Sequence, residues 1–231
     1  MRRILAAGLL GSALALSACT AADPSPAPTP KSEPTTQSPT QSPKLADAEL
    51  FPIDNNQVYL EIPKDWSFDT PSCKTDCSEW DQIEFYDGEK NHVLTLLPNT
   101  ATSTDGDMNL YDRKVLMRTE QPDLKVPGLD YIPRSVIAEY WRAENQETSK
   151  KATGLSIAMV DDEILEKSGK EPALYYFKMN DENWPMFFVD SSYLYKRIGS
   201  NPREQAAADF VASDEYALIE KIMLTVRTAG G

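Results

Sequence analysis

The sequence of 231 residues holds only one histidine, His92, and three cysteines. A structural zinc site needs about four nitrogen or sulfur ligands, and a catalytic zinc site about three. Two closely spaced cysteines and one histidine supply neither set, so we expect no metal and no cofactor. A Ser-His-Asp triad would have to use His92, and nothing else in the sequence points to one. We interpret His92 as a polar side chain beside a turn.

Positive charge is also scarce. The formal net charge is −13, from 23 basic and 36 acidic residues. Residues 1–46 hold four of the basic and two of the acidic residues, so the rest of the chain carries about −15. This charge argues against binding to nucleic acid and against direct adsorption to anionic lipid. Solubility accounts for most of it, and weak binding of cations or of a basic partner stays open.

The longest apolar run, Ile4–Ala18, is short. Its length of about fifteen residues falls below the roughly 20 that a transmembrane helix needs. The run follows the basic pair Arg2-Arg3, and a cationic start before a short apolar run is typical of a signal peptide. The other features of the twin-arginine export pattern are missing, so we expect export of an unfolded chain.

The run ends at Leu16-Ser17-Ala18-Cys19. This resembles the lipobox of bacterial lipoproteins, in which leucine and two small residues precede an obligatory cysteine. The resemblance implies that residues 1–18 are removed and that Cys19, the new N-terminus, carries a diacylglyceryl group. Each buried CH₂ contributes about 0.8 kcal/mol, so the lipid would hold the protein at the extracytoplasmic face of a bacterial cell membrane. The alternative is an ordinary secretory signal followed by a chance cysteine.

Residues 19–46 have the composition of a tether. Seven of the 17 prolines fall here among serine, threonine and glutamine, without one aromatic residue. Such a segment buries too little apolar surface to offset the entropy of ordering it, so we predict a disordered tether. Proline favours an extended chain of roughly 3.1 Å per residue, which makes the tether a spacer. Serine and threonine among prolines also suggest O-glycosylation as a hypothesis.

Residues 47–231 suffice for a single domain. Alternating apolar and polar residues predict a strand at 58–62. Segments 83–86 and 92–97 flank a glycine-bearing loop and predict a hairpin. Residues 110–117 fit a helix or a strand. Four later segments are rich in β-branched and aromatic residues and favour an antiparallel meander: 136–141, 155–160, 173–179 and 185–189.

The end of the chain predicts helices. Asn201-Pro202-Arg203-Glu204 has an N-cap residue, proline at N1 and glutamate at N3, which is a helix-opening pattern. Ser213 is a second candidate cap, and the apolar residues after it form one stripe. We therefore predict an α+β fold: an antiparallel β-sheet packed by C-terminal helices, after a disordered tether.

Cys73 and Cys77 are four positions apart. Outside the cytoplasm such a pair is typical of a disulfide. The closed loop is short, so the entropy model gives a stabilisation of only about 2 kcal/mol. A redox site would need a two-residue spacer at the start of a helix, whereas this spacer has three residues and lies near Pro71. We predict a structural disulfide, with the redox and free-thiol states as alternatives.

Two segments resemble known functional motifs but lack residues that those motifs require. Gly154–Ala158 looks like a nucleophile elbow, but the last glycine is missing and the strand follows the motif, so Ser156 is placed on a strand face. The segment from Asp105 to Asn109 looks like the start of a calcium loop, but Leu110 stands where the EF-hand needs glycine. A looser calcium site using Asp105, Asp107 and Asn109 stays an alternative to a plain acidic loop.

Aromatic residues gather between Tyr175 and Tyr195. Tyr175, Tyr176 and Phe177 are consecutive, and on a sheet such neighbours point to opposite faces. One face would be core, and the other would be covered by a helix, a ligand or a partner. If it is uncovered, it is a candidate interaction surface.

Two stretches carry a family likeness. Tyr59–Trp66 resembles the strand-proline-tryptophan opening of PsbP-like domains and LpqN-type lipoproteins, and Phe210–Tyr216 resembles their closing helix. Together the two stretches cover under a fifth of the domain. The resemblance implies an antiparallel sheet between helices, no known catalytic residues, and an auxiliary or binding role in the envelope.

We therefore expect a non-enzymatic, membrane-anchored lipoprotein that binds an envelope protein or a small ligand. The alternative is a hydrolase that acts on wall or glycan through a carboxylate pair, although no spacing among the 36 acidic residues singles one out. Asp161-Asp162-Glu163 is interpreted as a solvated turn. A solute receptor feeding a transporter is a third possibility, disfavoured because the pattern shows no second lobe.

Overall fold

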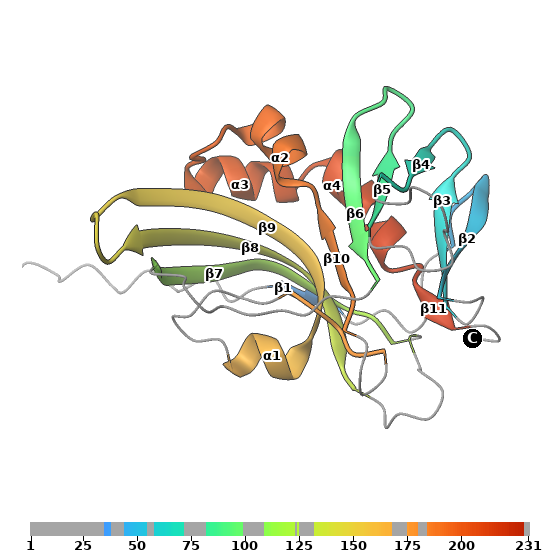
Figure 1. Cartoon of the computed structure of the whole chain (residues 1–231), viewed down its shortest axis with the longest axis horizontal. Helices are drawn as coiled ribbons and strands as arrows, with labels where there is room; N and C mark the ends of the chain where they lie inside the picture. Colours follow the sequence, from blue (N-terminus) through green and yellow to red (C-terminus); the bar gives the residue numbers. More distant parts are fainter. Residues whose placement is uncertain are drawn as a thin grey trace, which may run out of the picture. The chain divides into compact units, whose positions relative to one another are not determined.

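The computed structural model describes residues 35–37, 44–54, 58–71, 82–98, 109–122, 124, 132–167, 175–179 and 184–228. The chain divides between Glu33 and Pro34, and every described residue lies in the second unit, Pro34–Gly231. Within these residues the structure holds eleven strands, arranged in two sheets, and four helices (Figure 1).

The larger sheet has eight strands in the order β1-β7-β8-β9-β10-β6-β5-β4. Neighbouring strands pair antiparallel, except that β1 runs parallel to β7. The predicted antiparallel sheet is confirmed, and three residues of the predicted tether add a strand at its edge. The strands are β1 (Thr35–Gln37), β4 (Ser67–Asp69), β5 (Ile83–Tyr86), β6 (His92–Leu97), β7 (Asn109–Glu120), β8 (Arg134–Asn145), β9 (Lys151–Asp161) and β10 (Met186–Val189).

The three long strands β7, β8 and β9 form consecutive hairpins. The strands predicted at 136–141 and 155–160 lie within β8 and β9, and the segment that fitted either a helix or a strand is part of β7. The turn between β8 and β9 closes with a hydrogen bond of 2.9 Å from the Asn145 N–H to the Lys150 carbonyl. The Asn145 side chain also accepts a hydrogen bond from the Thr148 N–H, which fixes the turn.

β10 confirms the strand predicted at 185–189, but the strand predicted at 173–179 is wrong over its described part, Tyr175–Met179. This segment runs beside the sheet and makes single hydrogen bonds to two different neighbours. The Tyr176 carbonyl accepts from the Asp161 N–H, and the Phe177 N–H donates to the carbonyl of Pro185. These separate bonds replace the regular ladder that a strand needs.

The smaller sheet has three strands in the order β11-β3-β2, namely β2 (Ala48–Asp54), β3 (Val58–Pro63) and β11 (Arg227–Thr228). The Glu61 N–H on β3 donates to the Thr225 hydroxyl at 2.9 Å, and the Glu61 carboxylate pairs with Arg227 at 2.6 Å. These contacts tie the end of the chain to β3. The strand predicted at 58–62 and the predicted β5–β6 hairpin are both confirmed.

The four helices are α1 (Asp162–Lys167), α2 (Ser191–Ile198), α3 (Glu204–Val211) and α4 (Asp214–Met223). Ser213 caps α4 as predicted, because its hydroxyl accepts from the Tyr216 N–H at 3.2 Å. The predicted start of α3 is wrong: its N-cap is Arg203 instead of Asn201. Asn201 and Pro202 bind Thr153 on β9 and are therefore not used for capping.

The helices divide between the two faces of the larger sheet (Figure 1). α2 and α3 lie on what we call the helix face, where the Tyr140 hydroxyl donates to the Pro202 carbonyl at 3.3 Å. α1 lies on the opposite, far face, where the Ser135 hydroxyl donates to Asp162 at 2.7 Å. Strand alternation assigns the other residues of β8 and β9: Val136, Ala138, Leu155, Ile157 and Met159 to the helix face, and Ile137, Glu139, Ser156, Ala158 and Val160 to the far face.

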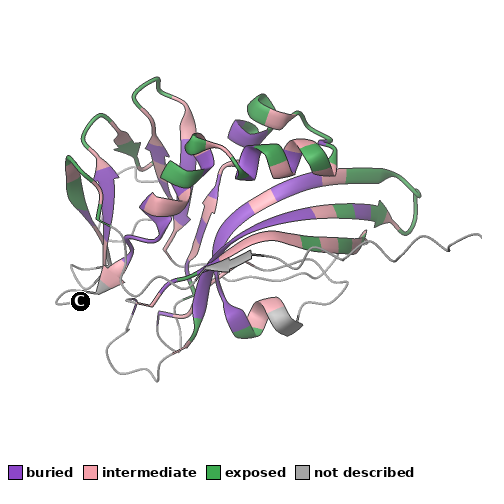
Figure 2. Cartoon of the chain, turned by 180° about the vertical axis from the view of Figure 1, so that it is seen from behind, coloured by how far each residue is buried: buried purple, intermediate pink, exposed green. Residues whose placement is uncertain are grey.

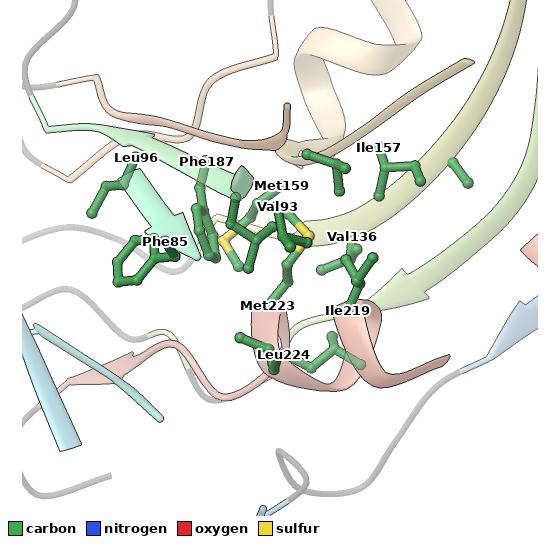
Figure 3. Packing of buried hydrophobic residues seen from close by; sticks show 14 of the residues in the cluster. Phe85, Val93, Leu96, Val136, Ile157, Met159, Phe187, Ile219, Met223 and Leu224 are labelled. Carbon is green, nitrogen blue, oxygen red and sulfur yellow. The ribbon is translucent and has the colours of Figure 1, made fainter. Parts of the chain in front are cut away.

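The core lies where the helices meet the helix face. Figure 2 shows burial concentrated there and lost toward the β8–β9 turn. Figure 3 shows Ile219 and Met223 of α4 next to Val136 and Met159 of the sheet. All four are nearly inaccessible to solvent. Full burial of one such side chain contributes about 1.5–3 kcal/mol, so the predicted packing of C-terminal helices on the sheet holds the fold together.

Candidate functional site

The ladder between β9 and β10 is short, and beyond its end lies a cavity that we call the notch. The last pair is Phe188 with Ala158. The chain then turns at Asp190 into α2, while β9 continues back to Lys151. The notch has a volume of about 240 Å³ and is mostly apolar, so it suits an apolar group. Its lining residues are Leu155, Ser156, Ile157, Ala158, Tyr175, Met186, Phe188, Val189, Ser191 and Leu194.

A tryptophan of the neighbouring strand fixes Ser156 in the wall of the notch. The Trp141 indole N–H donates to the Ser156 hydroxyl at 3.1 Å. The Trp141 ring lies across Gly154, where a β-carbon would come within 2.2 Å of Cζ2. Glycine at this strand position therefore makes room for the ring. Tyr111 on β7 packs edge-on against the same ring, with 5.9 Å between the centroids.

Tyr175 links the notch to a buried charge on β8. Its hydroxyl donates to Glu139 Oε2 at 2.7 Å, and Ser156 is its other hydrogen-bond partner. Arg113 on β7 donates to the same oxygen through Nε at 2.9 Å and Nη2 at 2.6 Å. The Arg113 and Glu139 side chains are only 7% and 2% exposed. A charge pair this far from water is tolerated because hydrogen bonds satisfy it.

This network keeps the Tyr175 hydroxyl protonated. Burial, and then the nearby charge of Glu139, raise the pKa of Tyr175 well above its ordinary value. Tyr175 is therefore a hydrogen-bond donor at neutral pH and not a base. The only histidine of the sequence, His92, lies on β6 and bonds to Thr95 at 2.9 Å, so it does not serve Ser156. The arrangement can bind a group, and none of the described residues that line the notch is a base that could activate a serine.

A second, wider cleft of about 400 Å³ lies between the β3–β4 turn, the β5–β6 turn and helices α2 and α4. Glu215 accepts hydrogen bonds from Arg197 Nε, at 2.6 Å, and from the Tyr193 hydroxyl. Burial, and then the hydrogen bond to Glu215, raise the pKa of Tyr193. Three of the four carboxylates in the cleft accept hydrogen bonds from their own turn or from a helix. The four carboxylates are Asp65, Asp87, Glu89 and Glu215, of which Asp87 accepts two N–H groups of its own turn.

The prediction of a solvated turn at Asp161–Glu163 is wrong. Asp161 and Asp162 are buried. Asp161 accepts from Arg134 Nε at 2.8 Å, and Asp162 pairs with Arg118 at 2.7 Å. Burial raises the pKa of Asp161 above its ordinary value, against the opposing effect of Arg134. Arginines from two other strands compensate these charges, and a local acidic run does not reveal them.

The predicted lipidation and disulfide sites lie outside the described residues. Cys19, Cys73 and Cys77 all belong to undescribed segments, so their modifications stay predictions. Among the described helices, none is both long and apolar enough to cross a membrane.

The loose calcium site is described only in part. Asp105 and Asp107 lie outside the described residues. Asn109 begins β7, and its side-chain oxygen accepts from the Asn145 amide at 3.3 Å, which ties it to β8. Across the described ranges, no three histidine, cysteine, aspartate or glutamate side chains are grouped to hold a metal ion.

The consecutive aromatic residues point in different directions, as expected. Tyr175 joins the buried network, and Phe177 is 1% exposed in the core. Tyr176 stacks on Trp184, with 5.1 Å between the centroids and 17° between the ring planes. Trp184 is 36% exposed and Tyr195 is 46% exposed, so these two residues are the exposed part of the aromatic cluster.

Sequence reasoning placed Ser156 correctly on a strand face but did not find the notch. Four of the five residues of the rejected elbow motif, Leu155 to Ala158, line it. The available signal is a serine next to a glycine within an apolar strand. That signal does not reveal where β10 leaves the sheet, and this departure creates the cavity.

No family model matches the chain, and neither does any curated protein. Among solved structures, the chain is similar to cyanobacterial PsbP (CyanoP) from Synechocystis sp. PCC 6803. The TM-score is 0.34 and the identity 10%, over 80% of this chain and 95% of the other. The Tyr59–Trp66 stretch resembles the same family. At these values the similarity supports no inference about function.

Proposed function

We propose that this chain is a lipoprotein anchored at the extracytoplasmic face of a bacterial membrane, and that its domain binds a ligand in the notch without catalysis. The notch is the observation that carries the binding function, because apolar side chains surround about 240 Å³ of space. The hydroxyls of Ser156 and Tyr175 stand in its wall and are held by hydrogen bonds with Trp141 and Glu139. Such fixed, neutral groups orient a ligand.

The N-terminal sequence supports the location. A signal-like run, the lipobox-like residues before Cys19 and a proline-rich spacer follow one another in the order that an anchored domain needs. The test is radiolabelled fatty-acid incorporation and cell fractionation of Cys19→Ala. We expect loss of label and release from the membrane, whereas Cys73→Ala, the matched control, keeps both. Lipid label on Cys19→Ala would contradict the anchor.

The binding function is tested by photoaffinity labelling of the full chain with an uncharged phenyl diazirine, followed by mass mapping. We expect adducts on the lining segments of β9 and α2. Ser191→Trp places a large ring at the exposed rim of the notch and should remove these adducts. Lys196→Trp adds the same ring elsewhere on α2, outside the notch, and should leave them. Adducts spread evenly over the surface in all three proteins would refute a ligand site here.

A hydrolase is the second candidate function, favoured by the four carboxylates in the wider cleft. A glycoside hydrolase needs two carboxyl groups about 5–10 Å apart across the substrate. Asp87 and Glu215 hold structure through short hydrogen bonds, whereas Glu89 accepts only a 3.5 Å bond from the Asn91 amide, so Asp65 and Glu89 are the pair to test. Release of sugars from wall fragments by the full chain, lost in Asp65→Asn and kept in Asp209→Asn, would establish this function in place of simple binding.

A further inference from the structure

Main-chain groups of β9 point toward the notch at alternate residues. The hydrogen bond between Asn145 and Lys150 starts a ladder in which the even-numbered residues of β9 bond to β8. The odd-numbered residues therefore direct their N–H and C=O groups away from β8. Two of them show this directly. The Thr153 N–H donates to the Asn201 side chain at 3.3 Å, and the Asp161 N–H also bonds outward.

Leu155 lies between these two outward bonds, so its N–H and C=O groups face the notch. Within the described part of the chain, no strand pairs with β9 on this side from Lys151 to Ile157. Leu155 is only 7% exposed, so water has little access to its main chain. Peptide groups in such a place gain from a hydrogen-bonding partner.

We propose that the notch takes a short extended peptide segment with one bulky apolar side chain. This inference rests on the proposed binding function and names its ligand class. A peptide residue offers one N–H and one C=O at the spacing that pairs with Leu155, as an added strand does. The side chains of Val189 and Leu194, on the same face as that of Leu155, line the space for its apolar group.

The ends of the notch limit the length of the segment. At one end β10 still pairs with β9 at Ala158. At the other end Asn201 and Pro202 bind the N–H and hydroxyl of Thr153, so the edge of β9 is occupied again. A long strand therefore does not fit along β9. One central residue pairs with Leu155, and its two neighbours reach the ends of the cavity.

The experiment uses the full chain and a blocked tripeptide, acetyl-Val-photoleucine-Val-amide. A matched depsipeptide carries an ester oxygen in place of the photoleucine N–H. We expect the amide probe to crosslink to notch residues of β9 and α2. The ester should bind roughly three- to tenfold more weakly, because it removes one donor to the Leu155 carbonyl. Ser191→Trp should abolish the crosslinks, and Lys196→Trp should keep them.

The outcomes separate this inference from the function on which it rests. Labelling of the notch by the phenyl diazirine without peptide crosslinks, or equal binding of ester and amide, overturns the peptide inference and leaves the binding function. Absence of both labels overturns both. Displacement of the peptide by a fatty acid at equal concentration assigns the notch to an acyl chain. A dimer that Ser191→Trp dissociates, and Lys196→Trp does not, assigns it to a second copy. Either of these two results overturns the inference that the notch binds a peptide.

Discussion

On the helix face of β8 and β9 the buried side chains are mostly apolar and pack under α2, α3 and α4, apart from the pair Arg134–Asp161 at the strand ends. The far face of the same strands buries a charge pair in the middle of the sheet, Glu139 with Arg113. Met159 on the helix face belongs to the apolar core cluster. Glu139 on the far face is just as inaccessible, yet it bonds Arg113 and Tyr175. Met159 and Glu139 are thus equally inaccessible to solvent, one through apolar packing and the other through charged hydrogen bonds.

This difference shows where the stability and the site of the domain reside. Apolar burial on the helix face is non-directional and tolerates substitutions that keep volume. The far face depends on hydrogen bonds with fixed partners, because a buried group without its partner is costly. Directional bonds also hold the hydroxyls of Ser156 and Tyr175 still, so the far face supplies the two fixed hydroxyls in the wall of the notch.

The largest expected effect comes from breaking the charge pair on the far face. Glu139→Met leaves Arg113 without its carboxylate partner, and removing one partner of a buried pair costs about 3–5 kcal/mol. Met159→Ala on the helix face should cost about 2–5 kcal/mol by leaving a cavity. Urea unfolding monitored by circular dichroism measures both free energies.

The double variant Arg113→Met/Glu139→Met separates the two faces. It removes both charges, so most of the loss seen in Glu139→Met should be regained. If the double variant is as unstable as Glu139→Met, the far face is held by packing, as the helix face is, and the contrast between them fails.

The second largest loss of stability is expected where the Trp141 ring, which holds Ser156, packs on Gly154. Gly154→Ala places a methyl group within 2.2 Å of the Trp141 ring, so the ring must move. Overpacking of this kind costs about 1–3 kcal/mol. In a Trp141→Leu background the same substitution should cost much less, because the large ring is absent. Equal costs in the two backgrounds, measured by urea unfolding, would show that the ring does not set the requirement for glycine.

The helix face was largely predictable from the sequence because a half-buried strand carries a period of two. Ile83–Tyr86 shows this, with Ile83 and Phe85 buried and the residues between them less so. Ser213 and its apolar stripe predicted α4 for a similar reason, since capping and periodicity are local signals. α2 was missed because it is only eight residues long and its cap, Asp190, follows a strand directly.

The far face was not predictable because its partners are distant in sequence. Arg113 lies 26 residues from Glu139, and Tyr175 lies 36 residues from it. Asp162 looked like part of a solvated acidic turn, since its arginine partner, Arg118, stands on β7. Only the register of the sheet brings these groups together, and single-sequence patterns do not contain the register.

Removing an ion pair at the exposed rim of the helix face should change the free energy of unfolding less than the substitutions above. Glu204 at the start of α3 pairs with Lys114 at 2.6 Å and with Arg142 at 2.9 Å. The hydrogen bond from Lys114 lowers the pKa of Glu204. The ionised Glu204 carboxylate therefore stabilises the folded state above a pH of about 4, and this stabilisation is lost as the pH falls further. Because these side chains are partly exposed, Glu204→Gln should cost below about 1 kcal/mol at neutral pH. Thermal unfolding should show no difference from the parent at low pH.

The smallest effect lies on the far face of β5 and is silent at neutral pH. The Tyr86 hydroxyl donates to Glu84, and this bond, followed by burial, raises the pKa of Tyr86 to about 12. A raised pKa means that the folded state favours the protonated phenol. Its contribution to stability is complete below the unfolded value of about 10 and is lost as the pH rises toward 12. Phenolate absorbance should show one tyrosine titrating near 12, absent in Tyr86→Phe and shifted toward 10 in Glu84→Gln. If Glu84→Gln leaves that titration unchanged, the far face perturbs Tyr86 by burial alone, as an apolar face does.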